Sequence, residues 1–319
     1  MAGPQHGQAT ANAPGTSVRC DDATAEGRPG GAGSKPAPGL YLVATPIGNM
    51  GDITLRAIET LRHADLIACE DTRVTGKLLA RLGLAVPLVA YHEHNADRAG
   101  QTLLAQLREG RVVALVSDAG TPLISDPGWR LVRTCRDEGI AVTALPGPSA
   151  ALTALQLSGL PAQPFLFAGF LPRTAAARRA AAHDLALVPA TLIFFESPNR
   201  LGASLADLAA ILGDRPAAIA RELTKLHEEI SPGTLTELAE RYRQAPARGE
   251  VVLVVGPPAA QAPAGDADID GRLAEALAGG ASLKDSAALV AAETGRQRRE
   301  VYARALRLAK RAAKGGPAE

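Results

Sequence analysis

Three segments rich in glycine, proline and small polar residues each follow a short apolar run. They are 45–52 (TPIGNMGD) after 40–44, 117–128 (SDAGTPLISDPG) after 112–116, and 145–150 (LPGPSA) after 141–144. Glycine lets a ligand approach the backbone closely, and proline fixes the shape of a loop. One such segment is an ordinary strand-to-helix turn, but three of them at strand ends favour a preformed ligand pocket.

The ligand is not a typical nucleotide, because none of the three segments matches G-x-G-x-x-G or G-x-x-x-x-G-K-[ST]. Few basic side chains accompany them, which argues against a polyphosphate. A neutral or cationic ligand held by backbone groups and Asp118 fits better. S-adenosylmethionine, which carries a sulfonium, is a ligand of this kind.

Apolar periodicity places these loops in two α/β domains. Short apolar runs alternate with segments of helical spacing, which predicts a parallel sheet with helices on both faces. The cluster SGLPAQP at 158–164 predicts a domain boundary, after which the alternation resumes. The predicted organisation is a disordered leader at 1–38, α/β domains at 39–160 and 161–256, a linker at 257–267 and a helical module at 268–314.

Composition limits the class of protein. The net charge of +1 means that any nucleic-acid-binding face is local rather than global. The three cysteines show neither a disulfide framework nor a C-x-x-C metal pair. No apolar run is long enough for a membrane span, and no secretory signal is present. We therefore predict a cytoplasmic protein without a membrane partner.

Seven ordered segments indicate a family. They are ATPIGNMGDITLRA, ACEDTR, SDAGTPLISDPG, PGPSA, FAGFLPR, FFESPNR and ARELTKLHEE. Together they resemble the small-subunit ribosomal RNA methyltransferase I family of the tetrapyrrole methylase superfamily, over about residues 40–256 and more loosely to 314. The resemblance implies two α/β domains with S-adenosylmethionine in the cleft between them, a homodimer, and 2′-O-methylation of a cytidine in the decoding region of 16S ribosomal RNA.

The resemblance also implies a set of cofactor-binding residues. They are Pro46, Gly48, Asp118, Ala119, Gly120, Ile124, Ser125, Ser149 and Ala150. Porphyrin-precursor methylases tend to begin with G-x-G-P-G-D, where this chain has TPIGNMGD. This departure weakens the hypothesis that the substrate is a tetrapyrrole.

A ribose hydroxyl is a weak nucleophile and must lose its proton, for example to a lysine of lowered pKa, a histidine or a carboxylate. We predict Lys225 or Glu222 as the proton acceptor or orienting group, with Arg73 and Arg200 holding phosphate. The alternative for each is an ordinary surface ion pair. His92-Glu93-His94 lacks a third ligand nearby in sequence, so we predict no metal site.

Basic residues are concentrated in two places. Arg173 precedes a predicted helix with Arg178 and Arg179, and Arg298 and Arg299 begin a basic C-terminal helix. Helix–turn–helix character at 282–309 favours docking to 16S ribosomal RNA or the small ribosomal subunit, and DNA is not expected beside an enzyme core. A solvated amphipathic tail is an equal alternative.

Three other functions compete with this hypothesis. A methylase of a small molecule, such as a porphyrin precursor, is opposed by the basic tail and the first loop. A noncatalytic ribosome-assembly factor on an inherited methylase fold would bind RNA without the cofactor. A nicotinamide-dependent oxidoreductase lacks its glycine fingerprint here.

Overall fold

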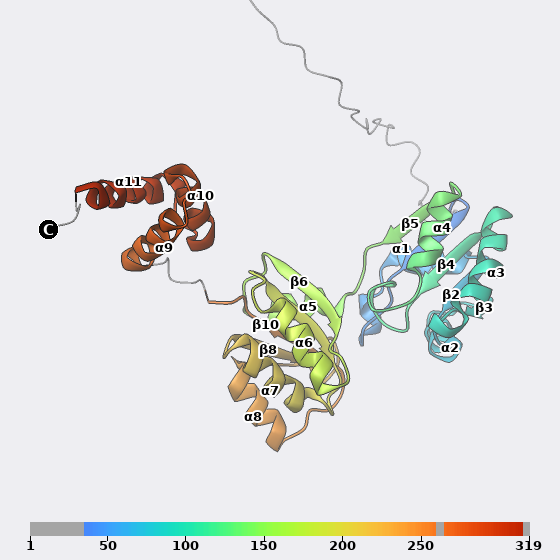
Figure 1. Ribbon diagram of the computed structural model, residues 1–319. Coiled ribbons are helices and arrows are strands. Elements are labelled where there is room, and N and C mark those ends of the chain that lie inside the picture. Colours follow the sequence, from blue (N-terminus) through green and yellow to red (C-terminus); the bar gives the residue numbers. More distant parts are fainter. Residues whose placement is uncertain (1–34, 260–264, 315–319) are drawn as a thin grey trace, which may run out of the picture. The chain divides into compact units, whose positions relative to one another are not determined.

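The computed structural model describes residues 35–259 and 265–314 (Figure 1). Residues 1–34 of the predicted leader (1–38) and residues 260–264 of the predicted linker (257–267) lie outside the described residues. The chain divides into two compact units, of which the first comprises Met1–Pro46 and Met50–Pro148. The second comprises Ile47–Asn49 and Ser149–Glu319.

The first unit is a five-stranded parallel sheet in the order β3-β2-β4-β1-β5. Its strands are β1 (Gly39–Val43), β2 (Leu66–Cys69), β3 (Leu88–Ala90), β4 (Val112–Val116) and β5 (Val142–Leu145). Its helices are α1 (Leu55–His63), α2 (Thr72–Arg81), α3 (Ala96–Arg108) and α4 (Trp129–Asp137), with short 3₁₀ turns η1 (Met50–Asp52) and η2 (Glu93–Asn95).

The central strand β4 shows why this sheet is covered on both faces. Val112, Ala114 and Val116 join the core that includes α1 and α2. The intervening Val113 and Leu115 join the core that includes α3 and α4. A strand buried on both sides reads as a continuous apolar run, as the sequence predicted here.

The second unit contains a mixed sheet in the order β6-β7-β10-β8-β9. Its strands are β6 (Phe165–Phe170), β7 (Thr191–Glu196), β8 (Pro216–Arg221), β9 (Glu229–Thr234) and β10 (Val251–Val255). Only β6 and β7 are parallel neighbours; β10 is antiparallel to β7 and β8, and β8 to β9. The sequence did not predict β9, which contains Pro232 and Gly233 and lies at the sheet edge where they are tolerated.

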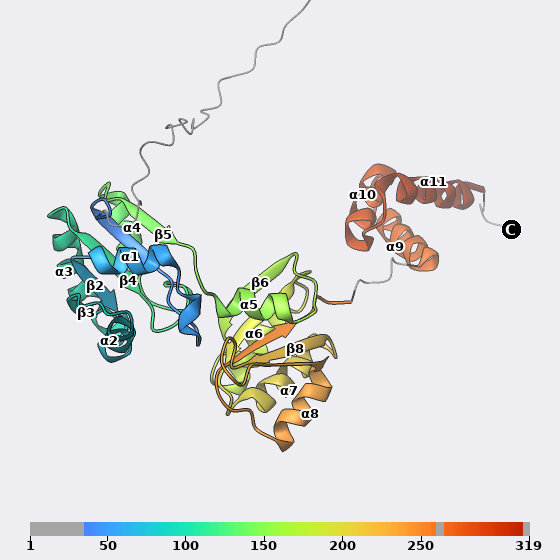
Figure 2. The ribbon, with the colours of Figure 1, turned by 180° about the vertical axis from the view of Figure 1, so that it is seen from behind.

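Helices cover both faces of this second sheet (Figure 2). α6 (Ala175–Leu185), α7 (Leu201–Leu212) and α8 (Leu235–Gln244) pack on one face. On the other face, α5 (Ala150–Leu157) buries Ala151, Ala154 and Leu155 beside Ile47. Because α5 packs on the second sheet, the units divide at Pro148 and not at the predicted residue 160.

The second unit also includes three C-terminal helices with a core of their own, which we call the helical module. They are α9 (Asp266–Ala278), α10 (Leu283–Thr294) and α11 (Arg298–Lys314). Leu273, Val290 and Val301 are among the residues that they bury together. Gly295 adopts the left-handed conformation that ends α10 and turns the chain into α11. No helix within the described ranges is both long and apolar enough to cross a membrane.

Candidate functional site

Two of the predicted loops in the first unit are joined by backbone hydrogen bonds. The N–H of Thr45 donates to the carbonyl of Gly120 at 2.9 Å, and the N–H of Gly120 donates to the carbonyl of Thr45 at 3.0 Å. The Thr45 hydroxyl donates to the Ser117 carbonyl at 3.1 Å, and the Ser117 hydroxyl donates to the Gly120 carbonyl at 3.0 Å. The segments after β1 and β4 therefore support each other.

The segments after β2 and β5 are tied to the same structure. The Thr121 hydroxyl donates to the Pro148 carbonyl at 2.9 Å, and the Asp71 N–H donates to Asp118 Oδ1 at 3.1 Å. A Cβ on Gly147 would lie 2.7 Å from the Cβ of Ala44, so only glycine fits there. We call 45–46, 70–71, 117–128 and 146–148 the interlocked loops. They follow four strands at the carboxyl edge of one sheet, where α/β proteins bind ligands.

The loop after β4 is held in an uncommon backbone conformation. Leu123 and Ser125 have φ angles of 71° and 69°, which are unfavourable for residues other than glycine. Ile124 lies between them with its side chain exposed. Backbone strain of this kind persists where surrounding contacts enforce it, and it is enriched at ligand sites.

The interlocked loops are acidic. Burial, followed by the nearby charges of Glu70 and Asp118, raises the pKa of Asp126 to about 6, against a weaker opposing hydrogen bond from Ser117. The loops contain Glu70, Asp71, Asp118 and Asp126 but no lysine or arginine. This surface suits a cation better than a phosphate.

We expect Asp126→Asn to stabilise the protein at neutral pH. Because the folded-state pKa of Asp126 exceeds its ordinary value of 3.8, its favourable contribution is complete below about pH 4 and is lost as the pH rises through about 6. Asparagine does not ionise, so the variant shows no such loss. The free energy of unfolding of the variant minus that of the wild type should therefore be larger at pH 7.5 than at pH 4, by at most about 3 kcal/mol. Urea unfolding at both pH values measures the gain, and an equal difference at the two would contradict it.

A second group of predicted residues lies in the second unit, around the loop 222–228, which we call the Lys225 loop. Ile47 is buried in the core beneath α5, and the Asn49 N–H donates to Thr224 Oγ1 at 3.1 Å. A Cβ on Gly48 would lie 2.5 Å from Lys225 Cγ and 2.9 Å from the Leu223 carbonyl oxygen. Segment 47–49 therefore packs on the Lys225 loop without room for a side chain at Gly48.

Lys225 is held between two carboxylates. Its Nζ lies 3.0 Å from Glu222 Oε1 and 2.9 Å from Glu250 Oε2. Burial alone would lower the pKa of Lys225, but the hydrogen bonds to Glu250 and Glu222 outweigh it and raise that pKa. The backbone N–H of Glu250, and then Lys225, lower the pKa of Glu222. Lys225 is thus an ammonium at neutral pH, in contrast to a base with a lowered pKa.

The structure divides the predicted cofactor residues between the two units. Pro46, Asp118, Ala119, Gly120, Ile124 and Ser125 belong to the first unit and lie in the interlocked loops, whereas Gly48, Ser149 and Ala150 belong to the second. Ser149 caps α5, where its hydroxyl accepts a hydrogen bond from the Leu152 N–H at 3.5 Å, and Ala150 begins that helix.

The predicted phosphate-binding arginines differ in availability. Arg73 is 86% exposed and shares its guanidinium with Asp71. Arg200 donates through Nη2 to buried Glu196 and to the Leu171 carbonyl, whereas its Nη1 is buried and has no partner among the described residues.

In the other predicted clusters Arg173, Arg179, Arg298 and Arg299 are exposed, and Arg179 lies 3.6 Å from Asp207. The remaining three are Arg173, Arg298 and Arg299. Each is exposed and has no ion pair with another described residue. Arg178, five residues after Arg173, is buried against Asp207 and therefore has a structural role.

Two residues of these clusters were not found by sequence reasoning. Asp126 stands inside the quoted SDPG motif, where its burial gave no signal. Glu250 precedes a predicted strand and belongs to no motif. Within residues 35–259 and 265–314, no group of three or more histidine, cysteine or carboxylate side chains is arranged to hold a metal ion.

Comparison with known proteins agrees with the fold. Residues 39–239 match the family model of the Tetrapyrrole (Corrin/Porphyrin) Methylases, and residues 263–309 match the RsmI C-terminal HTH domain. A cobalt precorrin-4 methyltransferase of cobalamin biosynthesis has a solved structure that matches with a TM-score of 0.54 and 21% identity, over 68% of this chain and 94% of that one. At this identity the likeness shows the fold alone.

Two curated relatives are much closer in sequence. Ribosomal RNA small subunit methyltransferase I of Mesorhizobium japonicum is 55% identical over 273 residues, which cover 85% of this chain and 92% of that protein. The protein of the same name from Escherichia coli O157:H7 is 49% identical over 270 residues, which cover 84% and 94%. The chain therefore belongs to the tetrapyrrole methylase family and, within it, to the ribosomal RNA small subunit methyltransferase I family.

Proposed function

We propose that this chain transfers a methyl group from S-adenosylmethionine to the ribose 2′-hydroxyl of a cytidine in the decoding region of 16S ribosomal RNA. The curated relatives are named for methylation of small-subunit ribosomal RNA. The observation that carries the proposal is the set of interlocked loops, which joins four strand ends into a preformed acidic surface.

The chemistry of the interlocked loops fits a sulfonium cofactor. They offer backbone groups and carboxylates but no cation that would pair with a polyphosphate. Bound S-adenosylmethionine supplies an electrophilic methyl group. We assign its binding in the first unit to Pro46, Asp118, Ala119, Gly120, Ile124 and Ser125, and propose Gly48, Ser149 and Ala150 as its partners from the second unit.

The Lys225 loop suits the handling of the hydroxyl proton. Lys225 Nζ is a charged hydrogen-bond donor and can orient the ribose oxygen. As an ammonium it has no lone pair of electrons, so it cannot accept the hydroxyl proton. The ionised Glu222 carboxylate, held at 3.0 Å from Lys225, is the acceptor that we propose. Arg73 is proposed to hold a phosphate, because most of its side chain is exposed.

The helical module is proposed to dock ribosomal RNA. Three of its arginines are neutralised internally: Arg272 by Asp268 and Glu293, Arg296 by Asp266 and Glu300, and Arg304 by Asp266 and Asp270. Arg298, Arg299, Arg307 and Lys310 are exposed and have no ion pair within the described residues. In α11, Arg299, Arg307 and Lys310 project opposite the buried Val301 and Ala305, as their helical spacing requires.

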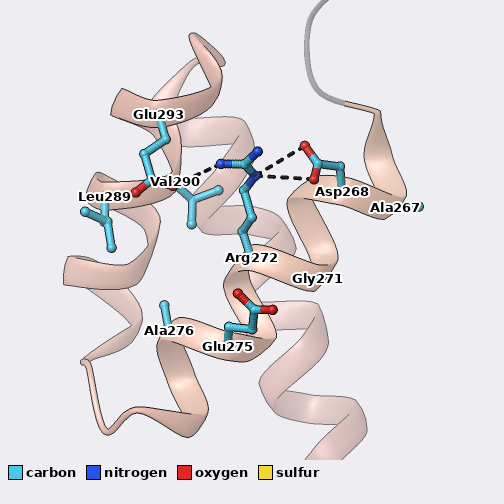
Figure 3. A pocket seen from close by; sticks show the side chains of 9 residues that line it. All are labelled: Ala267, Asp268, Gly271, Arg272, Glu275, Ala276, Leu289, Val290 and Glu293. Carbon is cyan, nitrogen blue, oxygen red and sulfur yellow. Dashed lines mark hydrogen bonds and ion pairs between the residues drawn. The ribbon is translucent and has the colours of Figure 1, made fainter.

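A pocket between α9 and α10 marks the face of the module that does not suit phosphate. Figure 3 shows Asp268, Glu275 and Glu293 along its walls, with Arg272 bound to Asp268 and Glu293. Carboxylates repel a phosphate backbone, so the RNA-facing side is assigned to the exposed cations of α11.

Mass mapping of ribosomal RNA tests the function. In a strain that lacks this gene, we expect small-subunit RNA to lose one ribose methyl on a decoding-region cytidine. The wild-type protein should restore it, and Asp118→Arg should not. An unchanged map in the deletion strain would contradict the proposal. We further propose that the protein acts in the cytoplasm. We also propose that it is a homodimer, and sedimentation of the full chain measures this oligomeric state.

A further inference from the structure

The outer face of α4 combines an exposed aromatic ring with arginines. Trp129 is 59% exposed, although it is the only tryptophan of a chain with 3% aromatic residues. Arg133 and Arg136 follow it at i+4 and i+7, so they lie on the same face of the helix. Both are exposed, while Leu131 and Cys135 on the opposite face are buried in the core.

The charge of this face is positive. Arg136 has no ion pair within the described residues, and Arg133 approaches Asp137 only at 3.8 Å with both side chains exposed. Arg130 lies 3.5 Å from Asp97 and places its guanidinium carbon 5.5 Å from the centre of the Trp129 ring. Exposed ion pairs of this kind contribute little and leave their arginines free to change partner.

The position of Trp129 is fixed by the loop that precedes it. Gly128 has a φ of 136°, and a Cβ there would lie 3.0 Å from Leu115 Cδ2. Only glycine therefore allows the chain to pass from the interlocked loops into α4 at this point. Trp129 consequently stands at the carboxyl edge of the first sheet, directly after the loop that contains Asp118 and Asp126.

We propose that the α4 face is an RNA-binding surface, in which Trp129 stacks on an unpaired base and Arg133 and Arg136 contact neighbouring phosphates. This inference rests on the proposed function, because the proposed function names RNA as the substrate. Aromatic rings and guanidinium planes stack on unpaired bases whatever their identity. From Trp129 to Arg136 the helix rises by about 10 Å, which suits a base and the phosphates of adjacent nucleotides.

Tryptophan fluorescence tests the stacking directly, because the full chain has a single tryptophan. Binding is measured by the fluorescence anisotropy of a fluorescein-labelled RNA oligonucleotide of the decoding-region sequence. Stacking is measured by the tryptophan fluorescence of the protein with the same RNA, unlabelled. We expect RNA to quench Trp129 in parallel with binding. Trp129→Ala should weaken RNA binding about tenfold, and Trp129→Phe should retain most of it. Leu187→Ala, at a residue 83% exposed in the second unit, is the matched control and should bind as the wild type.

Salt dependence tests the arginines. The double variant Arg133→Gln/Arg136→Gln should reduce the slope of log affinity against log salt by about 1.4, since each phosphate contact on a single strand contributes about 0.7. Arg81→Gln removes an exposed arginine that has no ion pair among the described residues. It lies at the end of α2, on the opposite face of the same sheet, and its loss should leave the slope unchanged.

The outcomes separate this inference from the proposed function. RNA binding without quenching, or unaltered binding by Trp129→Ala, would overturn the α4 surface while leaving methylation intact. Quenching that depends on protein concentration without RNA would assign the face to a second copy of the chain instead. Failure of both the oligonucleotide and undermethylated small subunits to bind would overturn the proposed function and this inference together.

Discussion

Gly48→Ala is expected to lower the rate of methylation by about a hundredfold with the fold retained, since angstrom-scale misplacement of a reacting group has effects of this size. The added Cβ would lie 2.5 Å from Lys225 Cγ, 2.9 Å from the Leu223 carbonyl oxygen and 2.9 Å from Thr224 Oγ1. The Lys225 side chain can rotate away, but the carbonyl cannot. The Lys225 loop and segment 47–49 must therefore separate.

The separation has local consequences that can be measured. It breaks the hydrogen bond from the Asn49 N–H to Thr224 Oγ1 and displaces Lys225 from Glu222 and Glu250. Single-turnover methylation of small subunits from the deletion strain measures the rate, and thermal unfolding reports the fold.

Gly76→Ala provides the matched control. Gly76 lies inside α2, where an added Cβ would meet nothing closer than 3.9 Å, so the variant should keep full activity and gain about 1 kcal/mol of stability. Full activity in Gly48→Ala would show that the Lys225 loop does not need its present position. A Gly48→Ala protein that fails to fold would assign this glycine to stability and not to the site.

The interlocked loops could be predicted from the sequence because their signal is local. A glycine- and proline-rich segment directly after an apolar run defines both the end of the strand and the position of the loop at the sheet edge. Parallel β4, buried on both faces, was equally clear because all five of its residues are apolar and buried.

The features that could not be predicted depend on residues distant in sequence. Glu250 meets Lys225 only because β8 and β10 are adjacent strands in the second sheet. Arg178 and Arg200 read as exposed cations until the fold brings Asp207 to the first and the Leu171 carbonyl to the second. Edge strand β9 gave no apolar signal because Ser231 is the only one of its six residues that is buried.

Asp118→Asn is expected to weaken S-adenosylmethionine binding by ten- to a hundredfold while the loops keep their shape. An amide oxygen at this position can still accept the Asp71 N–H, which lies 3.1 Å from Asp118 Oδ1, so only the charge is removed. The interlocked loops themselves contain no lysine or arginine, and Arg73, which interacts with the Asp118 charge, is bound to Asp71. Attraction of a carboxylate to a cation at close range contributes about 1 kcal/mol in water and about 4 kcal/mol near a protein surface, and the expected loss of about 1.4 to 2.7 kcal/mol lies between these limits.

S-adenosylhomocysteine separates charge from shape, because it lacks the sulfonium of the methyl donor. Calorimetry of both compounds should show a large loss for S-adenosylmethionine and a small one for S-adenosylhomocysteine in Asp118→Asn. Asp118→Ala also releases the Asp71 N–H, so it should weaken both. If Asp118→Asn loses equal affinity for both compounds, the carboxylate contacts a part of the molecule that they share and not the sulfonium. Unchanged affinity for both would remove Asp118 from the cofactor site, and the acidity of the interlocked loops would then need another ligand.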